Sequence, residues 1–214
     1  MIFKDRVDAG KKLAEALKLW DFSGGIVLAI PRGGVVVGAE VARALKVGLD
    51  LIIPRKIGSP QNPEVAVGAV TQDGTTIFDD FLLSKLGLLP RELSDSVRCE
   101  MAEIKRRMEV YRNSPEYPDL SGRPVIVVDD GVATGYTMLA ALRSVKKFEP
   151  LEVTLAIPVA PPKVLALLKE EVDRAVCLLT PENFYAVGQF YLDFDQTGDD
   201  EVVKLLKNFR QLEL

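Results

Sequence analysis

The sequence contains no histidine in 214 residues and only two cysteines. Because histidine is the usual general base of serine hydrolases and the commonest zinc ligand, its absence argues against Ser-His hydrolases and most metallohydrolases. Cys99 and Cys177 are far apart and form no Cys-x-x-Cys motif, so neither a zinc site nor a disulfide framework is indicated. We predict that both cysteines are buried small hydrophobic residues.

Long apolar runs and a secretory leader are also missing. No apolar run reaches the roughly 18 residues needed to span a bilayer, and the first residues are charged. The net charge of -4 and the pI near 5.1 argue against broad nucleic-acid binding, and they mean that an anionic substrate needs local cations. We therefore expect a cytoplasmic protein that binds neither membrane nor nucleic acid, built as one globular domain over residues 1–214.

The most informative segment present is 125–137, which reads Val-Ile-Val-Val-Asp-Asp-Gly-Val-Ala-Thr-Gly-Tyr-Thr. Its first four residues are β-branched and predict a strand buried on both faces, as in a parallel sheet. Asp129 and Asp130 follow at the carboxyl end of that strand, where ligands bind in open α/β sheets. Two adjacent carboxylates can accept hydrogen bonds from two neighbouring sugar hydroxyls.

A loop of small residues and a helix follow the two acids. The glycines allow the backbone to approach a ligand, Thr134 and Thr137 offer hydroxyls, and the helix would direct free N–H groups at a phosphate. Carboxylates beside such a loop suit ribose 5-phosphate. No Gly-x-x-x-x-Gly-Lys-Ser/Thr motif is present, which excludes the usual Walker-type nucleotide loop.

This segment resembles the ribose-phosphate-binding signature of type I phosphoribosyltransferases, in which an apolar strand leads to two acids, two variable residues, a small residue and Thr-Gly-x-Thr. The resemblance covers about residues 24–180 and implies an α/β fold with a central, mostly parallel sheet flanked by helices, followed by a C-terminal hood and helix at about 181–214. It implies phosphoribosyl pyrophosphate as donor and Mg²⁺ as cofactor, with Asp129 and Asp130 holding the ribose hydroxyls and the metal, directly or through water. The residues expected around the phosphate are Gly131, Val132, Ala133, Thr134, Gly135, Tyr136 and Thr137.

Strand and helix patterns alternate along the chain, which favours a parallel sheet with helices on both faces. Asp73-Gly74 predicts the turn of a hairpin. Residues 79–112 predict helix, and we interpret their many charges as a solvated face. The other predicted elements are helices at 7–20, 35–46, 162–171 and 199–209, and strands at 26–30, 49–54, 65–70, 75–78, 153–159 and 175–179.

Two further segments supply cations. Pro31-Arg32-Gly33-Gly34 follows the first predicted strand, and the resemblance implies that this loop binds pyrophosphate, with Arg32 as its cation and often with a non-proline cis peptide. Arg55 and Lys56 follow the second strand, where the resemblance implies cations that meet the diphosphate. We expect the turn-rich residues 57–66 to act as a lid.

The aromatic-rich segment 180–194 has two interpretations, edge packing or a hood over a planar ligand. The resemblance implies a nucleobase pocket here, and Phe184 and Tyr185 are its candidate residues. Hypoxanthine-guanine enzymes carry an aspartate where this sequence has Ala133, which makes a 6-oxopurine acceptor less favoured. The carboxylates that could replace that aspartate are Glu64, Glu182 and Asp193.

The resemblance implies a phosphoribosyltransferase of nucleotide metabolism, which transfers ribose 5-phosphate from phosphoribosyl pyrophosphate to a nitrogen acceptor such as a nucleobase and releases pyrophosphate. The alternative is a non-catalytic regulator that senses phosphoribosyl pyrophosphate on the same fold. The acidic pI and the lack of an attached helix-turn-helix module favour the transferase. A homodimer is a further expectation, because family members are commonly dimers.

Overall fold

The structure is a computed structural model that describes residues 2–112, 114 and 116–210, so the last four residues of the predicted C-terminal segment lie outside the described residues. The helices are α1 (Arg6–Leu17), α2 (Gly33–Leu45), α3 (Asp80–Leu86), α4 (Ser94–Arg112), α5 (Tyr136–Lys146), α6 (Pro162–Lys169) and α7 (Asp199–Arg210). The strands are β1 (Ile26–Ala29), β2 (Gly48–Leu51), β3 (Arg55–Gly58), β4 (Ala66–Val70), β5 (Thr76–Phe78), β6 (Pro124–Val128), β7 (Glu152–Val159) and β8 (Arg174–Leu179). None of the described helices is long and apolar enough to cross a membrane.

A five-stranded parallel sheet in the order β2-β1-β6-β7-β8 forms the centre of the molecule. Successive side chains alternate between its two faces, as the pleat requires. Val27 and Val128 pack in the apolar cluster that includes residues of α1, α2 and α7, whereas Leu28 and Val127 pack in the cluster formed with α5 and α6. The predicted α/β architecture is confirmed, and the strand at 125–128 lies at the middle of the sheet.

The register of the central strands brings the predicted site loops together. Val128 of β6 pairs with Ala29 of β1 and with Ala156 of β7. The chains leaving β1 and β6 therefore diverge from the same edge of the sheet, so that Ile30 and Asp129 follow directly at that edge.

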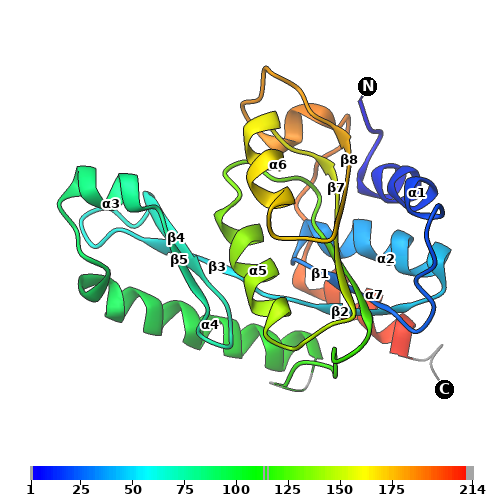
Figure 1. Cartoon of the computed structure of the whole chain (residues 1–214), viewed down its shortest axis with the longest axis horizontal. Coiled ribbons are helices and arrows are strands. Elements are labelled where there is room, and N and C mark those ends of the chain that lie inside the picture. The colour runs from blue at the N-terminus through cyan, green and yellow to red at the C-terminus, as the bar shows by residue number, and fades with distance from the viewer. Residues whose placement is uncertain (1, 113, 115, 211–214) are drawn as a thin grey trace.

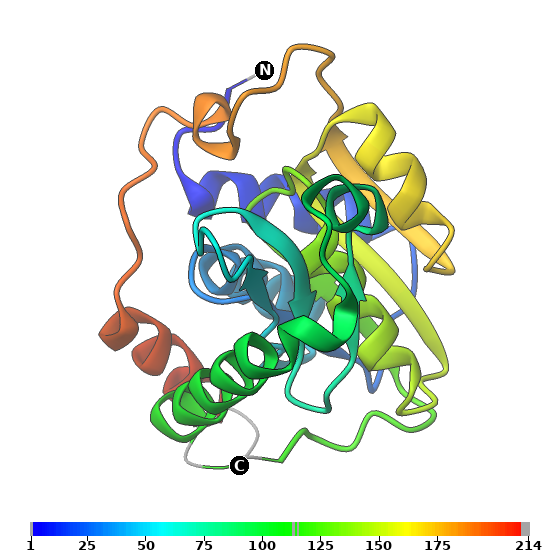
Figure 2. The same cartoon turned by 90° about the vertical axis from the view of Figure 1, so that its left-hand side faces the viewer.

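A smaller antiparallel sheet in the order β3-β4-β5 projects from the main body together with α3 and α4, and we call this unit the arm (Figures 1 and 2). The hairpin predicted around Asp73-Gly74 is confirmed. Strand β3 was not predicted: the sequence indicated only that Arg55 and Lys56 follow the strand at 49–54, whereas the structure pairs them with Val70 and Ala69 of β4. The buried side chain of Ile57 explains the difference, because it anchors the segment in the core.

The helical region predicted at 79–112 is divided in two. Gly87 ends α3 in the left-handed conformation, with φ of 66°. A short 3-10 turn at Pro90–Leu93 then leads into the long helix α4.

Asp73 ties the β4–β5 turn of the arm to α5. Its carboxylate accepts hydrogen bonds from Ser144 Oγ at 2.8 Å and from Lys147 Nζ at 3.1 Å, besides those from Thr71 and Thr75 in its own turn. Burial raises the pKa of Asp73, but these hydrogen bonds outweigh burial and hold the pKa well below its usual range. The arm is thereby fastened to the main body.

Replacing Asp73 by Asn should lower the free energy of unfolding by about 1.5–3 kcal/mol at pH 7, the range for hydrogen bonds to charged groups. Because the folded-state pKa lies below the unfolded value, this stabilisation is present above about pH 4 and is lost as the pH falls further. Urea unfolding of both proteins at pH 7 and pH 3 measures it, with the exposed Glu170→Gln as control. An equal difference at both pH values would contradict the assignment.

Candidate active site

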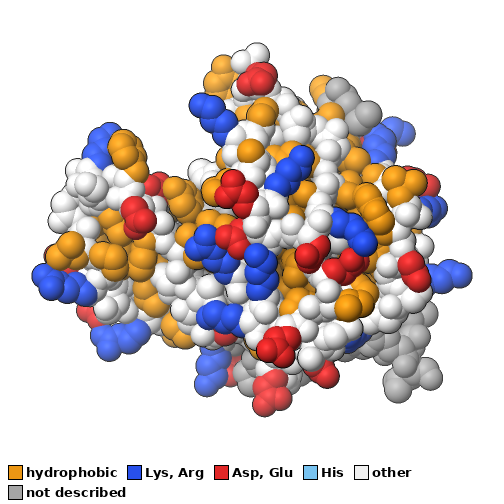
Figure 3. Space-filling model, in the orientation of Figure 1, with side chains coloured by type: hydrophobic (Ala, Val, Ile, Leu, Met, Phe, Trp, Pro, Cys, Tyr) orange, Lys and Arg blue, Asp and Glu red, His pale blue; other side chains and the backbone are white. Residues whose placement is uncertain are grey.

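A cavity of about 850 Å³ lies between the carboxyl ends of the central strands and the arm. Figure 3 shows that the molecule is hollowed between these two parts. The cavity brings together most of the segments that the sequence singled out. Its lining includes Arg32, Gly33, Arg55, Lys56, Asp129, Asp130 and Thr137, with Gly58, Ser59, Pro60 and Pro63 of the predicted lid.

The two acids lie against the glycines of the loop after β1. A Cβ atom on Gly34 would lie 2.8 Å from Asp129 Oδ1, and one on Gly33 would overlap Asp130 Oδ2. Glycine is therefore needed here for close approach. The predicted pyrophosphate loop and the predicted ribose acids form one continuous wall of the cavity.

Burial and mutual repulsion govern the charge of the acidic pair. Asp129 Oδ1 accepts a hydrogen bond from the backbone N–H of Asp130 at 2.8 Å. Burial, followed by the charge of Asp130, raises the pKa of Asp129 well above its usual value. Burial also raises the pKa of Asp130, and Arg6 opposes this effect. The pair is therefore harder to ionise fully than two exposed aspartates.

Arg6 is a residue of this site that the sequence analysis missed. Its Nε donates to Asp130 Oδ2 at 2.7 Å, and the two side chains are only 12% and 15% exposed. Arg6 and Asp130 are 124 positions apart, so no local sequence pattern indicates that they form a pair. An arginine at the start of an amphipathic helix gives no signal of its own.

The N-termini of α2 and α5 at this edge of the sheet have no side-chain cap, and neither has that of α6, which follows β7. The first residue of α5 follows Gly135, which adopts φ of 88°, and α2 begins after Arg32. By contrast, α1 and α3 are capped by the side chains of Asp5 and Asp79. The uncapped backbone N–H groups of α2 and α5 are suited to bind anions. The Pro31–Arg32 peptide bond is cis, as the resemblance implied.

The remaining residues of the predicted phosphate loop have different surroundings. Ala133 and Thr134 are exposed, and Tyr136 is half-buried. A Cβ atom on Gly131 would lie 2.5 Å from Val187 of the C-terminal segment, so glycine allows that segment to pack closely. The backbone N–H of Val132 donates to the Val159 carbonyl at 2.9 Å and is thus used by the fold.

Each arginine lining the cavity is paired with a carboxylate. Besides Arg6, these pairs are Arg32 with Asp199 at 3.2 Å, Arg55 with Glu100 at 2.6 Å, and Arg107 with Glu103 at 2.8 Å. Hydrogen bonds from Tyr111 and then from Arg32 lower the pKa of Asp199. Among the cavity's cations in the described part of the chain, Lys56 alone makes no ion pair.

Helix α4 contributes more to the cavity than the sequence indicated. Its charges were interpreted as a solvated face, yet Asp95, Glu100 and Arg107 line the cavity. Cys99 also lines it and is exposed, and Cys177 is half-buried, so the prediction of two buried cysteines was wrong. Sequence periodicity cannot show that the arm turns this helix toward the main body.

The aromatic residues of the C-terminal segment divide into two groups. Phe184 packs against Phe190, with ring centroids 5.3 Å apart, and Tyr185 is 90% exposed. Neither is among the residues lining the cavity, whereas Phe194 is. Phe194 is therefore the residue through which the predicted hood reaches the site.

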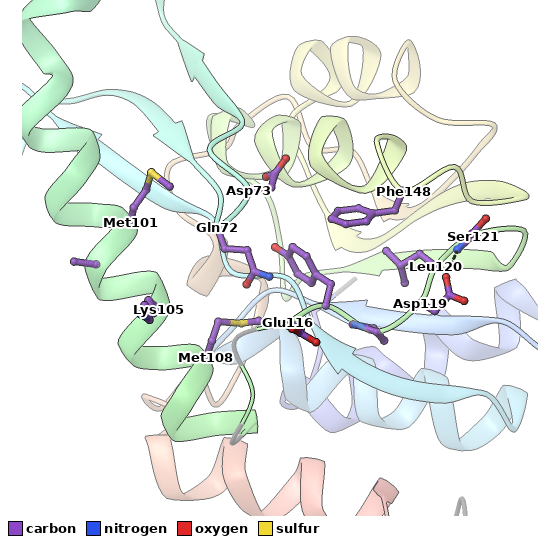
Figure 4. A pocket seen from close by; sticks show the side chains of 13 residues that line it. Gln72, Asp73, Met101, Lys105, Met108, Glu116, Asp119, Leu120, Ser121 and Phe148 are labelled. Carbon is purple, nitrogen blue, oxygen red and sulfur yellow. Dashed lines mark hydrogen bonds between the residues drawn. The ribbon is translucent and has the colours of Figure 1, made fainter.

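A second cavity of about 910 Å³ lies on the other side of α4 (Figure 4). Met101, Lys105 and Met108 of α4 face Phe148 and the connection before β6 across it. None of the predicted site residues lines this cavity.

The donor set can be compared with the preferences of Mg²⁺. Within the described residues, no group of three or more cysteine, aspartate or glutamate side chains could hold a metal by itself. Mg²⁺ is commonly held by one or two carboxylates together with substrate phosphates. Asp129 and Asp130, at the edge of a cavity suited to phosphates, fit that arrangement.

A family model and a curated relative both match most of this chain. The model of the phosphoribosyl transferase domain matches residues 6–195. A curated relative from Mycobacterium tuberculosis (strain CDC 1551 / Oshkosh), whose name provisionally assigns it as a phosphoribosyl transferase, is 40% identical over 205 residues. That match covers 96% of this chain and 46% of the relative, so the chain spans about half of the relative's length.

Solved structures agree with this match. The crystal structure of TT1426 from Thermus thermophilus is 40% identical, with a TM-score of 0.82 over 98% of this chain and 99% of that chain. A hypothetical protein from Neisseria gonorrhoeae with bound ppGpp shares the fold alone, with 16% identity and a TM-score of 0.51 over 97% of this chain and 98% of that chain. The chain therefore belongs to the phosphoribosyl transferase family and has the α/β fold of its type I members.

Proposed function

We propose that this protein transfers ribose 5-phosphate from phosphoribosyl pyrophosphate to a nitrogen acceptor, with a nucleobase as the leading acceptor class, and releases pyrophosphate. One observation carries the proposal. The acidic pair lies at the edge of the sheet from which α2 and α5 begin without side-chain caps, in a cavity that is also lined by five cationic side chains: Arg6, Arg32, Arg55, Lys56 and Arg107. A sugar with phosphate groups at both ends matches this distribution of charge.

In the proposed complex, the N-terminus of α5 with Thr134 and Thr137 binds the 5-phosphate. The loop after β1 and the N-terminus of α2 bind the pyrophosphate group, with Arg32 as the nearest cation of that loop. Asp129 and Asp130 accept hydrogen bonds from the ribose hydroxyls, and the same carboxylates would hold Mg²⁺ directly or through water. Mg²⁺ would supply charge neutralisation on the pyrophosphate.

The proposed reaction is the one that the family resemblance implies. The nitrogen of the acceptor displaces pyrophosphate at the anomeric carbon with inversion, through a transition state that resembles an oxocarbenium ion. The acidic pair favours positive charge on the sugar ring, while Arg55 and Lys56 favour negative charge on the leaving group. Residues 57–66 are the proposed lid, which would exclude water, and Gly58, Ser59, Pro60 and Pro63 of this segment line the cavity.

The test is a calorimetric titration with phosphoribosyl pyrophosphate and Mg²⁺, followed by a pyrophosphate-release screen over purine and pyrimidine bases. Binding with release that depends on a base would support the transferase and identify its acceptor. Binding without release from any base would favour the sensing regulator, and a failure to bind would overturn the donor site.

Replacing Asp129 by Asn should weaken donor binding by about tenfold or more, because a charged hydrogen-bond acceptor is lost. Asp129 makes no ion pair among the described residues, so the substitution leaves no cation unpaired, and the double variant with Asp130→Asn should bind more weakly still. Calorimetry measures both affinities, with Glu170→Gln as control. Unchanged donor affinity and turnover in the double variant would overturn the ribose assignment.

Replacing Lys56 by Ala should lower kcat by about 100-fold, the size seen for one donor that meets developing charge in a transition state. Lys56 is exposed and makes no ion pair among the described residues, so the thermal unfolding temperature should stay close to that of the wild type. The exposed Lys207→Ala is the matched control. A loss of activity that parallels a loss of folded protein would count against the catalytic role.

A further inference from the structure

Arg6 is held in place by three separate interactions. Its Nε donates to Asp130 Oδ2 at 2.7 Å, and its Nη1 donates to the backbone carbonyl of Asp195 at 2.6 Å. Its guanidinium carbon lies 3.8 Å from the centroid of the Phe194 ring, which is cation–π distance. Arg6 therefore joins the acidic pair to the C-terminal segment.

The backbone around Arg6 is fixed as well. Asp5 caps α1, whose first residue is Arg6. The N-terminal segment pairs with the C-terminal one, since Phe3 donates its N–H to the Phe190 carbonyl at 2.8 Å and accepts from the N–H of Leu192 at 2.8 Å. In the same segment, the Tyr191 hydroxyl donates to the backbone carbonyl of Asp130 at 2.6 Å. The N-terminal segment and residues 190–195 thus converge on Asp130.

The Arg6–Asp130 pair also explains why the neighbouring loop has a glycine, Gly33, beside it. A Cβ atom on Gly33 would overlap Asp130 Oδ2 and would lie 2.5 Å from Arg6 Nε. The backbone of Gly33 therefore packs directly on the ion pair, which leaves the Asp130 carboxylate little freedom to rotate. The ion pair is built into the wall of the cavity.

We propose that Arg6 is a positioning residue of the donor site, which holds the Asp130 carboxylate in the one orientation that meets the ribose hydroxyls. The inference rests on the proposed function, because it takes Asp130 as a ribose-binding group. Arg6 acts through Asp130. Through Arg6, the positions of α1 and of the C-terminal segment affect where the Asp130 carboxylate lies.

The physical reason is the crowding around the acid. Asp130 lies between the backbone of Gly33 and a second carboxylate, that of Asp129. Without the guanidinium, repulsion between neighbouring carboxylates and the loss of a charged partner would turn Asp130 away from its bound orientation. Donor affinity then falls although Asp129 and Asp130 are both present.

The experiment is a calorimetric titration of the full chain with phosphoribosyl pyrophosphate and Mg²⁺. The variants are Arg6→Gln, Arg6→Lys and Phe194→Leu. Arg174→Gln is the matched control, because Arg174 pairs with Glu152 at 2.6 Å and lies 5.7 Å from the Trp20 ring, at the amino ends of β7 and β8. Thermal unfolding of each protein separates binding from stability.

Arg6→Gln should weaken donor binding by about tenfold or more, the size expected when a charged hydrogen-bonding group is lost. Arg6→Lys should restore part of it, because a lysine keeps the charge but lacks the fork that reaches both Asp130 and Asp195. Phe194→Leu keeps the ion pair, so it should lose less donor affinity than Arg6→Gln. It also tests the proposal if Arg6→Gln fails to fold. Arg174→Gln should bind donor as the wild type does.

The outcomes separate the two proposals. Donor binding by the wild type together with equal or tighter binding by Arg6→Gln overturns the role of Arg6 and leaves the proposed function standing. Equal losses in Arg6→Gln and Arg174→Gln also overturn it, because the effect would then be general destabilisation. A wild type that does not bind the donor overturns the proposed function and the role of Arg6 together.

Discussion

Two carboxylates side by side at the end of a buried strand are the constraint on which this site depends. Asp129 and Asp130 directly follow the middle strand of the sheet at the wall of the cavity, and burial raises the pKa of both. The protein compensates with one guanidinium, that of Arg6, and with the backbone N–H of Asp130. Arg6 compensates Asp130 directly, whereas Asp129 is left with a hydrogen bond and no ion pair among the described residues.

This compensation explains why segments from both ends of the described chain lie at the site. A single buried ion pair costs desolvation of both partners, and it persists only where the geometry is well held. Here the cap at Asp5, the pairing of Phe3 with residues 190–192 and the ring of Phe194 supply that geometry. The C-terminal segment is thus part of the support of the acidic pair, as well as the proposed cover of the acceptor.

Local sequence patterns predicted those strands and turns whose conformation is determined by a few consecutive residues. The β-branched run at 125–128 and the turn at Asp73-Gly74 were found because each pattern is contained in a few consecutive residues. Strand β3 was missed, since its four residues show no clear alternation and gain their order from pairing with β4. Arg6 and the inward-facing side of α4 were missed because only the tertiary fold brings them to the acids.

The arginines of the cavity are already paired with carboxylates, so an anionic ligand must compete with those carboxylates. A phosphate group that meets Arg32 or Arg55 competes with Asp199 or Glu100, so binding exchanges one ion pair for another and gains little from each exchange alone. A ligand with several phosphate groups makes several such exchanges at once, so that small gains add up. The released Glu100 belongs to α4 and the released Asp199 to α7, which pack against each other. Donor binding would therefore act on the position of α4, the helix that forms the wall shared by the two cavities.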